Sequence, residues 1–129
     1  NDGLFLLHTI GVVDKPTPPN KFINKYIFPG GTCPSLSQII KPIEKTGLIV
    51  ADTETLIRHY DKTLLSWLNR FMAKKDLVKD MFDEKFVKMW SFYLASCAAA
   101  FRYRDLVVFQ LQIVKNFNAA RPTRDYIYS

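Results

Sequence analysis

The stretch Leu106-Val-Val-Phe-Gln-Leu-Gln-Ile-Val114 (LVVFQLQIV) is the longest segment of this sequence with the composition of a β-strand. β-Branched and aromatic side chains dominate it, and such side chains fit the pleated surface of a sheet. Its first half is apolar at every position, so both faces of the strand need cover. We therefore expect residues 106–114 to lie in the interior of a sheet.

Two further segments are predicted to be strands. Leu4–Ile10 (LFLLHTI) is apolar on both faces apart from His8 and Thr9, and we expect it to end at Gly11 and to lie inside the sheet. Leu48–Ala51 (LIVA) is a short third strand. Three strands are few for a sheet of this kind, so a missing neighbour is expected. The abrupt start of the first strand after Asn1-Asp-Gly3 suggests a fragment of a longer chain.

Helices are predicted between these strands. Pro34–Lys41 reads as a short helix with Ser35 as its N-cap and Gly47 beyond its end. Asp52 or Thr53 is expected to cap a second helix, and Asp83 a third. Apolar residues recur at helical spacing in both later helices: Leu56, Tyr60, Leu64, Trp67, Leu68 and Phe71, then Phe86, Trp90, Tyr93, Leu94, Cys97 and Phe101. The order strand, helix, strand, two helices, strand indicates an α/β fold.

Composition narrows the class of protein. The 129 residues are 48% hydrophobic and 23% charged, which is typical of one globular domain and excludes a disordered segment. The net charge is +6, with a pI near 9.4. The lysines are scattered and no nucleic-acid-binding motif accompanies them, so nucleic acid is not an expected partner. Attraction to an anionic membrane surface stays open. Cys33 and Cys97 lack metal-site spacing and are expected to be reduced, half-buried thiols, a disulfide being less favoured.

Several segments, taken in order, carry a family resemblance: FLLHTIG, NKFINKYIFPGG, PSLSQI, HYDKTLLSWLNRF and FDEKFVKMWSFYLASCAAAFRYRDLVVFQLQ. Together they resemble the C-terminal half of a cyclopropane-fatty-acyl-phospholipid synthase, collinearly and over nearly the whole chain. The resemblance implies a class I (Rossmann-like) S-adenosylmethionine-dependent methyltransferase fold with strand order 3-2-1-4-5-7-6. Residues 1–129 would be the C-terminal part of the catalytic domain, with strands 5, 6 and 7 and their covering helices. The cofactor-binding half would be absent.

The same resemblance implies a chemistry and a site. By this resemblance, the cis double bond of a phospholipid acyl chain attacks the methyl group of S-adenosylmethionine, and a bound bicarbonate ion is the base. The residues that match the family's bicarbonate ligands are His8, Ile10 through its backbone, and Tyr60. The family's cysteine and glutamate ligands lie upstream, and Cys33, Cys97, Glu54 and Glu84 do not match them. We therefore expect no turnover from this chain alone, and a parent enzyme that is cytoplasmic and bound peripherally to unsaturated phospholipid membranes.

Alternatives to these interpretations remain open at this stage. His8 could be a satisfied residue at a strand end, and Tyr60 a core residue with a bonded hydroxyl. The parent could be another methyltransferase of the superfamily, acting on lipid carbon or on small-molecule nitrogen. The chain could instead be a non-catalytic module that forms a homodimer through the unpaired edge of its first strand.

Overall fold

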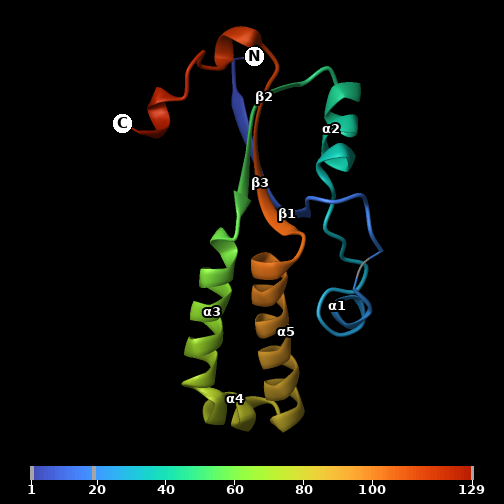
Figure 1. Cartoon of the computed structure of the whole chain (residues 1–129), viewed down its shortest axis with the longest axis vertical. Coiled ribbons are helices and arrows are strands. Elements are labelled where there is room, and N and C mark those ends of the chain that lie inside the picture. The colour runs from blue at the N-terminus through green and yellow to red at the C-terminus, as the bar shows by residue number, and fades with distance from the viewer. Residues whose placement is uncertain (1, 19, 129) are drawn as a thin grey trace.

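A computed structural model describes residues 2–18 and 20–128. Its centre is a three-stranded sheet of β1 (Leu4–Val12), β2 (Ile49–Ile57) and β3 (Leu106–Val114) (Figure 1). The spatial order is β1-β3-β2, and β3 is antiparallel to both neighbours. The interior position predicted for residues 106–114 is therefore confirmed. The order and direction of these strands are also those that the family resemblance implies for strands 5, 7 and 6.

The helices are α1 (Lys21–Tyr26), α2 (Leu36–Lys45), α3 (His59–Met72), α4 (Lys75–Met81) and α5 (Glu84–Tyr103). Two 3-10 turns, Phe117–Ala119 and Asp125–Ile127, follow β3. The helices α3 and α5 run side by side away from one end of the sheet, and α4 joins them at the far end (Figure 1). Over the described residues, none of these helices is both long enough and apolar enough to cross a bilayer.

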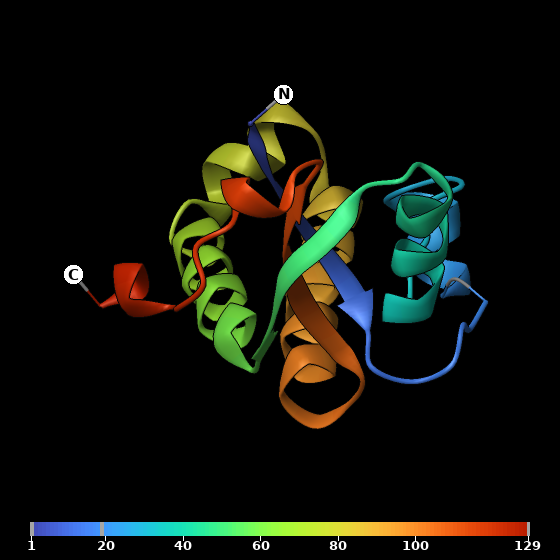
Figure 2. The ribbon, with the colours of Figure 1, turned by 90° about the horizontal axis from the view of Figure 1, so that it is seen from above.

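The side chains of β3 alternate between two apolar clusters, which explains why both of its faces are buried. Val107, Phe109, Leu111 and Ile113 pack with Ile39 of α2 on one face. Val108 faces the other way and packs with Leu64, Leu94, Ala98 and Phe101 of α3 and α5. Seen from above, α2 and the segment after β3 lie on opposite sides of the sheet (Figure 2). The core thus extends from the sheet into the helix pair.

The caps predicted at two helix starts are confirmed. Asp83 precedes α5, and its side chain accepts a hydrogen bond of 2.6 Å from the Phe86 amide. Ser35 precedes α2, and its amide donates a bond of 3.0 Å to Oε1 of Gln38. These bonds satisfy backbone N–H groups that would otherwise be unpaired at the start of a helix. Gly47 lies beyond α2 with a φ of +71°, the left-handed conformation expected there.

The prediction for the second strand was wrong in its extent. β2 continues to Ile57, so Asp52 and Thr53 are strand residues and cap no helix. Leu56 likewise belongs to the strand and not to the helical stripe. The physical reason is pairing: nine residues of β3 offer backbone partners along their whole length, and β2 follows them past an irregularity between Val50 and Asp52. Tertiary pairing of this kind overrides the local preference of polar residues for caps.

Other boundaries also differ from the expectations. β1 passes through Gly11 and ends at Val12, and the helix expected at 34–41 spans 36–45. The helices α1 and α4 were not predicted, because six and seven residues are too few to show a helical period. β1 lies at an edge of the described sheet, with the side chains of Leu4, Phe5 and Leu6 exposed. The part of the chain that the structure describes therefore leaves these apolar side chains of β1 largely uncovered.

Candidate functional site

His8 lies in a row of polar side chains that crosses the sheet. It pairs in register with Gln110 of β3, which in turn pairs with Glu54 of β2. His8 Nδ1 and Gln110 Nε2 are 3.0 Å apart, within hydrogen-bonding distance. Because side chains alternate along a strand, this row shares its face with Val108, two residues from Gln110. His8 therefore lies on the side of the sheet from which α3 and α5 extend.

Ile10 occupies the next row, and its backbone N–H points away from β3. The amide of Val13 donates to Asp105 O (3.0 Å) at the β3 side, whereas the amide of Val12 donates to Pro34 O (3.0 Å). Successive amides of a strand point to opposite sides, so Ile10 N–H lies on the same outer side as that of Val12. This donor is therefore turned to the outer edge of β1, two residues before the point where Pro34 contacts that edge.

Tyr60 lies in the first turn of α3, directly after the sheet. The preceding Arg58 has a φ of +64°, and this left-handed residue turns the chain from β2 into the helix. The Tyr60 ring is half-buried and packs against Phe101, with ring centres 5.2 Å apart. Ile10, Leu56 and Tyr60 all pack against the cluster formed around Val108. His8, Ile10 and Tyr60 therefore lie on one face of the sheet; that they share one ligand stays a prediction.

The hydroxyl of Tyr93 lies near Tyr60, Cys97 and Cys33, a group of side chains that the sequence did not single out as a site. Burial, followed by the nearby Cys97, raises the pKa of Tyr93 to about 12. Burial also raises the pKa of Cys97 to about 11. Cys33, on the loop before α2, has a raised pKa for the same reason, and all three groups stay protonated near neutral pH. Both cysteines are free and half-buried, as predicted. The spacing of Tyr93 and Cys97, four residues apart on one helix face, was visible in the sequence.

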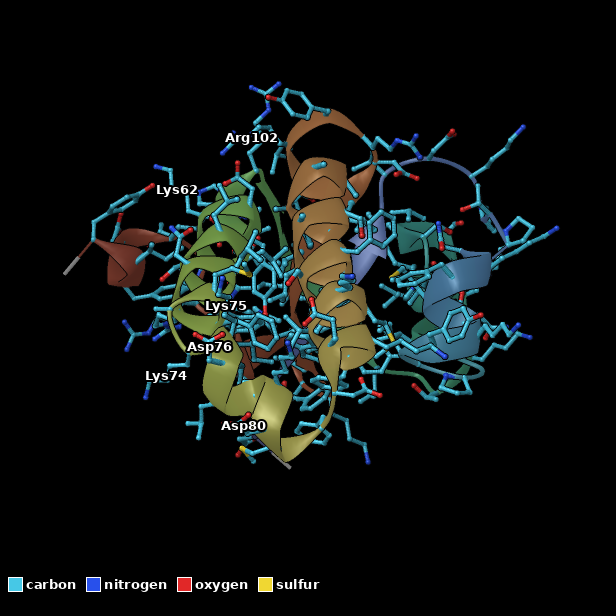
Figure 3. All side chains as sticks on the ribbon, turned by 90° about the horizontal axis from the view of Figure 1, so that it is seen from below. Lys62, Lys74, Lys75, Asp76, Asp80 and Arg102 are labelled. Carbon is cyan, nitrogen blue, oxygen red and sulfur yellow. The ribbon has the colours of Figure 1, made fainter. Side chains whose placement is uncertain are left out.

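The start of α3 is tied to the end of α5 by an ion pair between a buried carboxylate and a partly exposed guanidinium. Asp61 is only 5% exposed, and its Oδ2 accepts a bond of 2.7 Å from Arg102 Nε. Within the described part of the chain, the other carboxylate oxygen of Asp61 has no hydrogen-bond partner. In Figure 3, Arg102 and Lys62 lie apart from Lys74, just before α4, and from Asp80 within it. The Arg102-Tyr-Arg-Asp105 segment thus has a structural contact, which fixes the helix next to Tyr60.

This ion pair predicts an acid-sensitive component of stability. The hydrogen bond from Arg102 holds the pKa of Asp61 below its ordinary value. A carboxyl whose pKa is lower in the folded state stabilises the fold above its unfolded pKa, and this contribution is lost as the pH falls below about 4. We expect Asp61→Asn to be less stable than the wild type at pH 7, with a difference that shrinks by pH 3. Urea unfolding at both pH values measures this, and Asp80→Asn on exposed α4 is the control. An equal difference at both pH values would contradict the prediction.

The segment after β3 folds back over the same face of the sheet. Arg124 donates two hydrogen bonds to the Asp52 carboxylate, that from Nε being 2.8 Å long. The Gln112 amide donates to the Tyr126 hydroxyl. The Arg124 guanidinium lowers the pKa of Asp52. Between this segment and the sheet lies a hollow of about 230 Å³, lined by Leu6, Asp52, Glu54, Gln110, Gln112, Arg124, Tyr126 and Ile127. The polar row with His8 therefore borders the hollow.

Comparison with known proteins decides the family. The model of the mycolic acid cyclopropane synthetase family matches residues 1–111. The chain belongs to this family. The cyclopropane-fatty-acyl-phospholipid synthase of Escherichia coli (strain K12) is 40% identical over 110 residues, which cover 85% of this chain and 28% of that protein. Tuberculostearic acid methyltransferase UfaA1 of Mycobacterium tuberculosis is 43% identical over 96 residues, covering 73% of this chain and 22% of that protein.

Solved structures agree with this assignment. The cyclopropane synthase MmaA2 from Mycobacterium tuberculosis has a TM-score of 0.79 at 29% identity, over 87% of this chain and 44% of that one. The mycolic acid cyclopropane synthase CmaA1, in complex with SAH and CTAB, has a TM-score of 0.77 at 30% identity, over 86% and 44%. This member of the cyclopropane synthetase family thus spans less than half of either solved relative. Its fold is a mixed α/β part of the methyltransferase structures.

Proposed function

We propose that this chain is the C-terminal part of the catalytic domain of a cyclopropane-fatty-acyl-phospholipid synthase. The enzyme would transfer a methylene group from S-adenosylmethionine to the cis double bond of an unsaturated phospholipid acyl chain, with bicarbonate as the base. One observation supports the site: the side chains of His8, Ile10 and Tyr60 lie on one face of the sheet, and those of Ile10 and Tyr60 pack on one cluster. The Ile10 N–H points to the adjoining outer edge of β1. Family membership supports the reaction class.

The donors of this chain fit a small oxyanion. An imidazole N–H, a backbone N–H and a phenol O–H are three hydrogen-bond donors, and donors of this kind bind oxygen anions strongly. When bound, S-adenosylmethionine supplies the electrophilic methyl group and bicarbonate accepts the proton that the new methyl loses as the ring closes. The role of His8, Ile10 and Tyr60 is to hold and orient that base. Leu56 and Phe101 pack beside Tyr60 and would limit the access of water on that side of the site.

The cofactor makes a different demand, which these residues do not meet. A glycine-rich turn after a strand and an acidic residue after the next are the usual means of holding a nucleoside in a sheet of this type. The glycines with positive φ here, Gly30 and Gly47, flank α2 instead and follow no strand. We therefore assign no residue of this chain to S-adenosylmethionine. Its binding belongs to the remainder of the enzyme.

The proposed partner is the surface of a membrane that contains unsaturated phospholipids. The acyl chains to be modified lie in a bilayer, and a net charge of +6 favours approach to anionic headgroups. We accordingly place the enzyme in the cytoplasm, attached peripherally to the membrane.

A chimera tests the proposed function. The segment of the Escherichia coli synthase that this chain matches is replaced by this chain, and the purified chimera is mixed with labelled S-adenosylmethionine and vesicles. We expect label to enter acyl chains of vesicles with cis double bonds and not those of fully saturated vesicles. Mass spectrometry then distinguishes a ring from a methyl branch. A folded chimera that labels neither kind of vesicle would contradict the proposal.

A second candidate function, a module that pairs with a copy of itself, is favoured by the edge of β1. Leu4, Phe5 and Leu6 are 51%, 57% and 51% exposed, and exposed sheet edges invite pairing with another chain. We propose that such a homodimer would form through this edge. Size-exclusion chromatography across a range of concentrations tests it, and a monomer at every concentration would argue against it.

A further inference from the structure

We propose that Gln110 is a positioning residue that holds His8 as the tautomer with its proton on Nε2. The contact joins Gln110 Nε2 to His8 Nδ1 at 3.0 Å. In this orientation the amide nitrogen faces the ring and can only donate, so we assign Nδ1 as the acceptor and the proton of the neutral ring to Nε2. The tautomer of a histidine is set in this way by the bond that its other nitrogen makes.

The backbone of Gln110 is well suited to this role. It lies in the central strand, paired on one side with His8 and on the other with Glu54. Its neighbours in sequence, Phe109 and Leu111, are 2% and 0% exposed and anchor the strand in the core. Side chains opposite one another in an antiparallel pair have Cβ atoms about 5 Å apart, so the amide reaches the ring without displacing either strand. A rigid strand thus presents the donor.

The consequence for the proposed site is a free donor at the far side of the ring. With Nδ1 occupied by Gln110, His8 presents Nε2–H to an anion bound on the face shared with Tyr60. A ring with its proton on Nδ1 would present a lone pair at Nε2, which repels an oxyanion. This consequence rests on the proposed function. The tautomer itself does not, because it follows from the contact with Gln110 alone.

The second histidine of the chain is a built-in reference. His59 Nδ1 lies 2.9 Å from the carbonyl oxygen of Ile57. A carbonyl oxygen only accepts, so the neutral ring of His59 must carry its proton on Nδ1. His8 and His59 are the two histidines of this sequence, and the structure assigns them opposite tautomers. Two distinct patterns are therefore expected in one spectrum.

Long-range proton–nitrogen NMR correlations on the uniformly ¹⁵N-labelled chain, at a pH where both rings are neutral, test the proposal. Neutral imidazole in water already prefers the tautomer with its proton on Nε2, so the wild-type spectrum alone does not show that Gln110 sets the tautomer. The change in the ratio of tautomers in the Gln110 variants shows it. We expect Gln110→Glu to invert the ratio of tautomers at His8, because a carboxylate only accepts. Gln110→Met should shift that ratio about fivefold towards Nδ1–H, as loss of one hydrogen bond implies. His59 should not change in either variant.

The matched control is Gln112→Met. Gln112 shares the face of Gln110 two residues along β3, but its amide donates to the Tyr126 hydroxyl. The signals of His8 should be unaffected by this change. An unchanged ratio of tautomers at His8 in both Gln110 variants would overturn the proposal, as would a proton on Nδ1 in the wild type. If Gln110→Glu does not fold, Gln110→Met alone decides by the same criterion.

Kinetics in the chimera separate this proposal from the proposed function. Gln110→Glu should lower kcat at least tenfold and leave KM for unsaturated vesicles within about twofold, because in this proposal Gln110 acts only through the ring of His8. Gln112→Met should change neither constant. A wild-type chimera without activity would count against the proposed function and leave the NMR result standing. A changed tautomer without any change in kcat would overturn only the catalytic consequence.

Discussion

His8→Gln in the chimera is expected to lower turnover by about two orders of magnitude. Removing one preorganised donor to an anion that stabilises a reaction costs roughly 10²- to 10³-fold in kcat. The amide of glutamine still donates, but it reaches a different point from Nε2 of the ring. Because His8 is exposed, its replacement should alter the free energy of unfolding by no more than about 0.5 kcal/mol. The loss is therefore one of chemistry rather than of folding.

His59→Gln is the matched control for this experiment. His59 is also exposed, and we assign it no ligand. Its Nδ1 bonds the carbonyl oxygen of Ile57 at the start of α3. It should retain nearly full activity. Initial rates of label transfer to unsaturated vesicles, with urea unfolding of each variant, provide the comparison. If His8→Gln retained activity within threefold of the wild type, the assignment of bicarbonate to His8 would be wrong.

The sequence predicted well those features of the fold that depend on neighbouring residues, such as strand burial and helix caps. The apolar residues of 106–114 required cover on both faces, and β3 has it. Asp83 caps α5 through its side chain, and Ser35 caps α2 together with Gln38, as polar residues before an apolar helical period commonly do. The extent of β2 could not be predicted from its own residues, since Asp52 favours a cap locally. Its place in the strand depends on pairing with Gln112, sixty residues along the chain.

In the candidate site, too, some residues could be predicted from the sequence and others only from the pairing of distant strands. His8, Ile10 and Tyr60 came from the family resemblance, and nothing in local spacing joins a strand residue to a tyrosine on a later helix. Gln110 was missed, although the alternation in Phe109-Gln-Leu-Gln112 indicates a strand with one polar face. That signal shows that a polar row exists. Only the register with β1 shows that its partner is His8.

Gly11→Ala is expected to destabilise the chain by roughly 1–3 kcal/mol, the usual cost of overpacking a filled core. A Cβ at Gly11 would lie 2.4 Å from Cε2 of Phe109 and 2.6 Å from the carbonyl oxygen of Pro34. Phe109 is 2% exposed and packed in the cluster with Leu111, so its ring has little room to turn away. The carbonyl cannot yield either, because it accepts the hydrogen bond from Val12. Since space and not a special φ makes glycine necessary here, serine should fail as well.

Gly3→Ala controls for the general effect of alanine in place of glycine. A Cβ at Gly3 meets no atom within 4 Å, so this variant should stay within about 0.5 kcal/mol of the wild type. Urea unfolding followed by circular dichroism measures both. Equal stability of the two variants would mean that Phe109 and Pro34 do not approach β1 as closely as described. Because Gly11 follows Ile10, any clash that displaces β1 also moves the Ile10 amide. Gly11→Ala should therefore reduce activity in the chimera beyond its loss of folded protein, through a residue that touches no substrate.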